Sequence, residues 1–116
     1  MVNNGILIIT TNGNLDISSN SSAFIINNGI ILNEGTFINS ENAIISNFNT
    51  IKNNNKLFNY GLIYGTEYYF GDIHINGYSY DYSIIYNDSE LCNNGTINEN
   101  IYPNISIPIC SEEINS

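Results

Sequence analysis

The side chains that perform most enzyme chemistry are scarce in this sequence. Its 116 residues include one histidine, His74, two Lys and no Arg or Trp. Enzymes that cleave acidic polysaccharides use clustered acids together with Arg and Lys. Asp72, Asp81 and Asp88 could share a surface here, but no Arg is present to bind the carboxylate of such a substrate. His74 precedes Ile75 in an alternating segment and is expected to face solvent when Ile75 faces inward. We therefore expect no enzyme activity and no catalytic residue.

Metal binding is not predicted either. Asp81, Asp88 and Glu90 carry oxygen ligands of the kind that Ca²⁺ prefers. Their surroundings match neither an EF-hand loop nor the Gly- and Asp-rich nonapeptide of calcium-binding β-helices. We interpret them as solvated acids and expect no metal and no cofactor.

The composition excludes several classes of partner. The formal net charge is −9 at pH 7, and two cationic side chains cannot displace the counterions around nucleic-acid phosphates. An anionic membrane surface is disfavoured for the same reason. No apolar run reaches the roughly 18 residues that span a bilayer, and the first residues lack the basic segment of a signal peptide. We expect neither nucleic-acid binding nor membrane insertion.

The two cysteines, Cys92 and Cys110, are expected to form one disulfide. Cys92 ends a repeat unit at a position that should point outward, and a returning C-terminal segment can bring Cys110 to it. Closing a loop of roughly 18 residues constrains the unfolded chain by about 3 kcal/mol in the chain-entropy model. Two free thiols are the alternative.

Tyrosine is concentrated in one part of the chain. Eight of the nine Tyr lie between Tyr60 and Tyr86, and Tyr78, Tyr80 and Tyr82 alternate with Ser or Asp. On an extended segment this alternation presents three rings on one side, which suits a protein interface or a sugar platform. The alternative is that the rings pack on the chain's own body.

An internal repeat predicts the elements that position these residues. From Asn27 to Tyr64 the units are NNGIIL, NEGTFI, NSENAIIS, NFNTIK, NNNKLF and NYGLIY. Each opens with Asn and has an apolar penultimate residue, and five of the six are six residues long. The phase continues with units that open at Gly65, Gly71 and Gly77, and then with NDSELC and NNGTIN.

A six-residue unit accommodates one short strand and one corner. Asn and Gly suit corners because both tolerate positive φ, and stacked Asn side chains can form hydrogen-bonded ladders. Apolar residues do not recur every 3.6 residues, so no helix is expected. The sequence predicts an all-β fold, a parallel β-solenoid with three short strands per coil of about 18–22 residues and about five coils.

Grouping the units in threes gives coils over residues 27–46, 47–64, 65–86 and 87–104. Residues 1–26 are expected to add an N-terminal coil or cap, residues 27–102 to form the solenoid, and residues 103–116 to form a C-terminal tail or cap, because Pro103 and Pro108 interrupt the units. The grouping predicts three inward stacks: Ile31, Ile51, Tyr69 and Leu91; Phe37, Leu57, Ile75 and Ile97; and Ile45, Ile63 and Ile85.

The outward positions of the third face are predicted to form an interface. They are apolar, whereas the second face offers Thr36, Lys56, His74, Asn76, Thr96 and Asn98. Such a strip is larger than a soluble monomer usually exposes, so the Tyr-rich insertion, the C-terminal tail or another subunit should cover it. With the three alternating tyrosines, the predicted interface is Ile44, Leu62, Tyr64, Tyr78, Tyr80, Tyr82, Ile84, Tyr86 and Tyr102.

The units NNGIIL, NEGTFI and NNGTIN resemble the Gly- and Asn-rich repeats of haemagglutinin-type bacterial adhesins and of related β-helical fibre proteins, including viral ones. The resemblance implies a right-handed parallel β-helix with a structural, surface or attachment role. Hexapeptide acyltransferases, which are left-handed, place a small residue after the aliphatic one. Here that place holds Leu32, Ile38, Lys52 and Phe58, which argues against them.

These observations together predict a non-catalytic structural protein. We expect a self-associating solenoid subunit of a fibre, a surface appendage, or a virion or cell-surface layer, located outside the cell or on its surface. A solenoid leaves an unpaired strand edge at each end, so head-to-tail assembly is the leading mechanism. The alternative is a carbohydrate-binding or adhesin module that uses the Tyr-rich insertion. Expected partners are further copies of the chain, other surface proteins or glycans.

Overall fold

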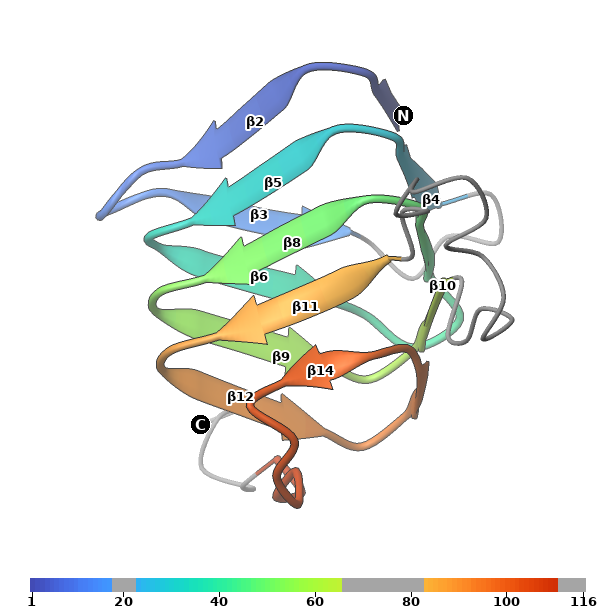
Figure 1. Cartoon of the computed structure of the whole chain (residues 1–116). Helices are drawn as coiled ribbons and strands as arrows, with labels where there is room; N and C mark the ends of the chain where they lie inside the picture. The colour runs from blue at the N-terminus through green and yellow to red at the C-terminus, as the bar shows by residue number, and fades with distance from the viewer. Residues whose placement is uncertain (18–22, 66–82, 111–116) are drawn as a thin grey trace, which may run out of the picture.

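The computed structural model describes residues 1–17, 23–65 and 83–110, and these residues form a parallel β-solenoid (Figure 1). They contain fourteen short strands and no helix. None of these residues therefore forms a helix that could cross a membrane. The predicted fold class is confirmed.

The strands stack into three sheets, called here faces A, B and C. Face A consists of β1 (Val2–Asn3), β4 (Phe24–Asn27), β7 (Ile44–Asn47), β10 (Leu62–Gly65) and β13 (Thr96–Asn98). Face B consists of β2 (Ile6–Ile9), β5 (Ile30–Asn33), β8 (Thr50–Asn53), β11 (Ile84–Asn87) and β14 (Ile101–Tyr102). Face C consists of β3 (Asn14–Ile17), β6 (Thr36–Asn39), β9 (Lys56–Asn59) and β12 (Glu90–Asn93).

Side-chain alternation within each four-residue strand builds the core. In β5, Ile30 is exposed, Ile31 is fully buried, Leu32 is half-buried and Asn33 is fully buried. The apolar second residue of each strand therefore points inward, and its neighbours on either side point outward. The fully buried apolar side chains of this kind are Ile31, Phe37, Ile45, Ile51, Leu57, Ile63 and Ile85.

The Asn residue that ends a strand also points inward and forms a ladder with its equivalents. Asn27 Nδ2 donates to Asn47 Oδ1 at 2.8 Å, and Asn33 Nδ2 donates to Asn53 Oδ1 at 2.7 Å. The Asn oxygen also accepts the backbone N–H two residues later, as Asn33 Oδ1 does from Gly35 at 3.1 Å. Buried amides need such partners, and this explains why the repeat requires Asn at this place.

The predicted register agrees with the structure in the second and third coils. The strand pairings place Ile31 beside Ile51, Phe37 beside Leu57 and Ile45 beside Ile63. The first coil is also a true coil, because β1, β2 and β3 pair with β4, β5 and β6. The solenoid strands therefore begin at Val2, and they end at Tyr102.

The predicted register after Gly65 is wrong. Ile85 lies beside Ile51 on face B, although it was expected beside Ile63. Leu91 and Ile97 are displaced in the same way and lie beside Leu57 and Ile63. The reason is that β10 on face A is followed among the described strands by β11 on face B, the next face in the order, whereas the repeat phase counted residues 65–86 as three sides of a coil. Tyr69 and Ile75 lie outside the described residues.

Candidate assembly surfaces

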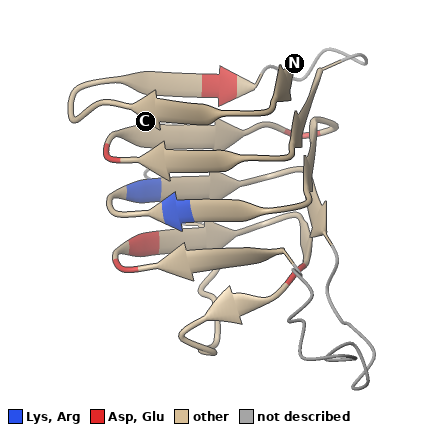
Figure 2. Ribbon diagram, turned by 45° about the horizontal axis from the view of Figure 1, so that its top comes forward, with Lys and Arg blue, Asp and Glu red and all other residues tan. Residues whose placement is uncertain are grey.

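The three faces differ sharply in charge. In the described strands of faces A and B, Lys52 is the only charged residue. The strands of face C contain Asp16, Lys56 and Glu90 (Figure 2). Lys52 forms an ion pair with Asp88 at the adjacent corner. Faces A and B can therefore approach another acidic molecule without strong repulsion.

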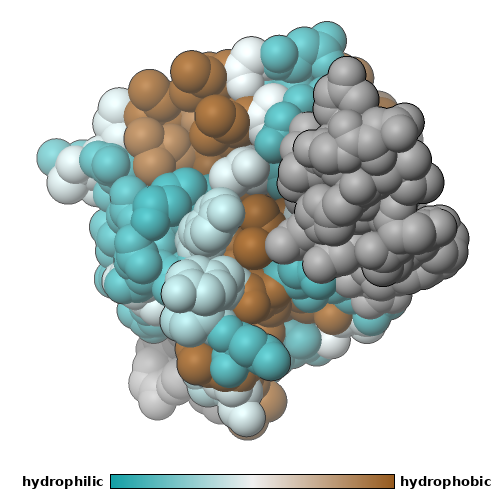
Figure 3. Space-filling model, viewed as in Figure 1, coloured by the Kyte–Doolittle hydropathy of each residue, from teal (hydrophilic) through white to brown (hydrophobic). Residues whose placement is uncertain are grey.

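Exposed aliphatic side chains gather on face B at the N-terminal end of the solenoid. Ile6 is 67% exposed, Ile8 is 54% exposed and Ile30 is 40% exposed, and Leu32 beside them is half-buried. These four residues, called here the aliphatic patch, lie on the neighbouring strands β2 and β5. Figure 3 shows the hydrophobic surface at the end where β2 lies. Contiguous apolar surface of this kind is typical of an interaction site.

The predicted interface strip is divided between two faces. Ile44, Leu62 and Tyr64 lie on face A, where the ring of Phe48 meets Tyr64 edge-on at a centroid distance of 6.4 Å. The register shift after Gly65 moves the other three to face B: Ile84, Tyr86 and Tyr102. Tyr78, Tyr80 and Tyr82 lie outside the described residues. The described residues of the predicted interface therefore do not form one continuous strip.

The expected polar set of the second face is divided by the same shift. Thr36 and Lys56 lie on face C, whereas Thr96 and Asn98 lie on face A. His74 and Asn76 fall outside the described residues.

The N-terminal end of the solenoid is an open end in the described part of the chain. β1, β2 and β3 are the terminal strands of their sheets. Leu7 and Leu15 point inward but are only half-buried, and they line a shallow hollow at this end. Ile9 and Ile17 occupy the corner positions beside Asn33 and Asn39, so two of the three ladders stop at an apolar side chain.

The C-terminal end is closed by the segment that follows β14. The backbone N–H of Asn93 donates to the carbonyl of Pro108 at 2.9 Å, and the N–H of Cys110 donates to Asn94 Oδ1 at 2.8 Å. Cys92 and Cys110, the predicted pair, are joined by a disulfide and are buried against Phe58. Ile107 packs on the end of the solenoid core.

A half-buried carboxylate fills a gap in the ladder of face A. Gly65 stands where the three preceding coils have Asn, and Glu99 of the next coil supplies the missing acceptors. Asn47 Nδ2 donates to Glu99 Oε2 at 2.6 Å, and Ser83 Oγ donates to Glu99 Oε1 at 2.5 Å. Sequence reasoning missed this role, although the loss of Asn at position 65 was a visible signal.

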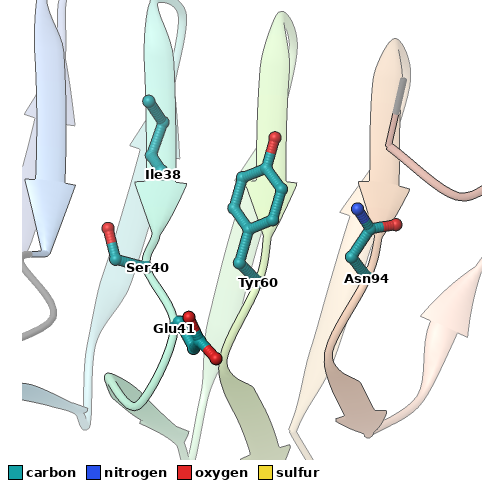
Figure 4. A pocket seen from close by; sticks show the side chains of 5 residues that line it. All are labelled: Ile38, Ser40, Glu41, Tyr60 and Asn94. Carbon is teal, nitrogen blue, oxygen red and sulfur yellow. The ribbon is translucent and has the colours of Figure 1, made fainter. Parts of the chain in front are cut away.

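A groove of about 450 Å³ lies at the corner between faces C and A. Ile38, Ser40, Glu41, Tyr60 and Asn94 line it, and the Tyr60 ring lies between Ile38 and Asn94 (Figure 4). An aromatic ring beside hydroxyl, amide and carboxylate groups is a combination that can bind a sugar. The sequence analysis did not single out this groove, because its residues come from three different coils.

No group of three or more His, Cys, Asp or Glu that could hold a metal ion occurs in the described residues. No family model, no curated protein and no solved structure matches the chain. The functional argument therefore depends on the surfaces of the solenoid itself.

Proposed function

We propose that the protein is a non-catalytic structural module that associates with further copies of itself, as a subunit of a fibre, a surface appendage or a surface layer. The observation that carries the proposal is that exposed apolar side chains gather on faces A and B, whose described strands contain one charged residue. Burying these side chains between copies would stabilise the contact by roughly 25 cal/mol per Å² of apolar surface, before the costs of association.

The charge distribution supports self-association. The chain has a formal net charge of −9, so two copies repel each other unless they meet where acids are absent. Faces A and B supply such surfaces, and face C does not.

The disulfide and the repeat support a location outside the cell, on a cell surface or on a virion. Disulfides persist in oxidising compartments and are rare in the cytosol. The resemblance of the Asn- and Gly-led units to adhesin and fibre repeats fits the same setting.

Association can be tested by sedimentation velocity over a range of concentrations, with negative-stain electron microscopy at the highest one. We expect species larger than a monomer, and we expect Ile30→Asp to reduce them by placing a carboxylate in the aliphatic patch. Thr36→Asp is the matched control, because Thr36 begins the next strand of the same coil on face C. A wild-type protein that stays monomeric at every concentration would refute the proposal.

The second candidate function is carbohydrate binding, and the groove at Tyr60 is the observation that favours it. A glycan array tests it directly. Binding that is lost in both Tyr60→Ala and Tyr80→Ala would support this function and would place the Tyr-rich insertion at the same site. Retained binding in both variants would exclude these tyrosines.

A further inference from the structure

We propose that two copies of the chain meet head to head through their N-terminal coils, so that β2 of one copy pairs antiparallel with β2 of the other. This inference rests on the proposed self-association and adds its orientation and its contact residues.

The backbone of β2 has hydrogen-bonding groups available for this pairing. Ile30 donates its N–H to the carbonyl of Gly5 at 2.9 Å, and Glu34 donates to the carbonyl of Ile9 at 2.8 Å. In a parallel sheet successive residues direct their backbone groups to opposite sides of the strand. The N–H and C=O groups of Ile6 and Ile8 therefore point to the free edge.

A twofold axis at Leu7 matches these groups. It places Ile6 of one copy opposite Ile8 of the other, and the reverse, so that each pair exchanges two backbone hydrogen bonds as antiparallel partners do. The aliphatic patches of the two copies become neighbours on one continuous sheet, where cross-strand aliphatic pairs stabilise the contact. The first coil of the second copy would also cover the half-buried Leu7 and Leu15.

The two ends of the solenoid are poorly matched for head-to-tail stacking. At the C-terminal end, Pro108 already accepts the N–H of Asn93, and Ile107 covers the core. At the N-terminal end, Ile9 and Ile17 have no amide oxygen. In a head-to-tail stack β12 would lie on β3, so the Asn93 amide would meet Ile17 and the ladder of face C could not continue. On face B, Pro103 follows β14 and would meet Ile9, and neither residue has a side-chain amide.

Electrostatics favours the same orientation. Within residues 1–17, Asp16 is the only charged side chain. The last two coils and their corners contain Asp88, Glu90 and Glu99. A head-to-head pair brings the least charged ends together and keeps the acidic ends apart.

Cross-linking distinguishes the two orientations. Ile8 and Tyr102 share one register position on face B, through Leu32, Lys52 and Tyr86. An Ile8→Cys protein with its native disulfide intact is treated with a short bismaleimide. We expect a covalent dimer from Ile8→Cys alone, no dimer from Tyr102→Cys alone, and no mixed product from the two together.

A mixed Ile8→Cys and Tyr102→Cys product without the Ile8→Cys dimer would overturn the head-to-head orientation and would leave self-association standing. A monomer in sedimentation together with no cross-linked product would overturn both. The two proposals therefore fail in different ways.

A proline at position 8 tests the backbone pairing. Ile8→Pro removes an N–H that faces the free edge and leaves the bonds to β5 in place, because proline is tolerated at strand edges of this kind. We expect dimerisation at least about tenfold weaker than in the wild type, whereas Ile8→Thr, which keeps the N–H and the β-branched shape, should change it much less. Circular dichroism and intact mass show whether the variants keep the fold and the disulfide. Equal dimerisation by the folded Ile8→Pro and Ile8→Thr proteins would overturn the β2 pairing.

Discussion

Replacing Asn53 by Ala should destabilise the solenoid far more than replacing its neighbour Asn54. Asn53 is fully buried in the middle of the face B ladder. Its Oδ1 accepts from Asn33 Nδ2 at 2.7 Å, and its Nδ2 donates to Asn87 Oδ1 at 2.8 Å and to the carbonyl of Glu90 at 2.9 Å. The Asn53→Ala substitution therefore cuts the ladder between the second and fourth coils.

The expected loss follows from the partners left behind. Asn33 Nδ2 still donates to the carbonyl of Lys56 at 2.8 Å, so its amide keeps one bond. Asn87 Oδ1 and the Glu90 carbonyl lose an amide donor each. A buried polar group without its partner costs about 1–3 kcal/mol, and we expect the free energy of unfolding to fall by about 3 kcal/mol in total.

Urea unfolding of the disulfide-intact protein, followed by circular dichroism, measures this difference. Asn54 is exposed, and its amide reaches only Glu34 Oε2 at 3.5 Å. Asn54→Ala should therefore change the free energy of unfolding by less than about 0.5 kcal/mol. Equal losses in the two variants would refute the argument that buried Asn ladders hold the coils together.

Three further results are expected. Replacing Cys92 and Cys110 together by Ser should lower the free energy of unfolding by about 3 kcal/mol in chemical denaturation, because the loop they close is then unconstrained. Gly65→Ala should destabilise strongly in a thermal melt, because a Cβ there would lie 2.3 Å from the Asn47 carbonyl oxygen, whereas Gly5→Ala, with open space around it, should not. Glu99→Ala should lower the melting temperature, and Glu99→Gln should largely restore it, because Gln keeps an acceptor for the Asn47 amide.

Much of the fold could be predicted because each coil repeats one local rule. An apolar residue in the penultimate place of a unit and Asn in the first place of the next give a strand with two inward side chains. Ile31 and Asn33 show this pattern in β5. The same pattern predicted the stacking of Ile31 on Ile51, which requires only that consecutive coils have the same number of sides.

The register after Gly65 could not be predicted from the same rule. Units of about six residues look alike whether they form a side of a coil or part of an insertion, and only strand pairing decides between these. Ile85 returns to face B beside Ile51 because β11 pairs with β8. The local sequence around Ile85 is equally compatible with any of the three faces.

The candidate surfaces were predictable residue by residue but not as a whole. Ile44, Leu62 and Tyr64 were correctly expected to point outward, and each does so on face A. The prediction that they form one strip with Tyr86 and Tyr102 depended on the register after Gly65, and it is wrong because that register is wrong. The aliphatic patch was not predicted, because Ile6 and Ile8 lie in less regular copies of the unit that precede the repeat from Asn27 to Tyr64.

The irregular positions of the solenoid mark where its chemistry differs from coil to coil. Each coil contacts only the coils next to it, and a ladder of identical Asn side chains gives every coil the same interior. Ile9 and Ile17 break that uniformity at the first coil, and Gly65 breaks it at the end of β10. The last break, after β14, is closed by the disulfide-bonded segment that ends at Cys110. Within the described residues, the first coil is the end at which two of the three ladders lack an amide and no returning segment packs, and for this reason we place the self-association contact there.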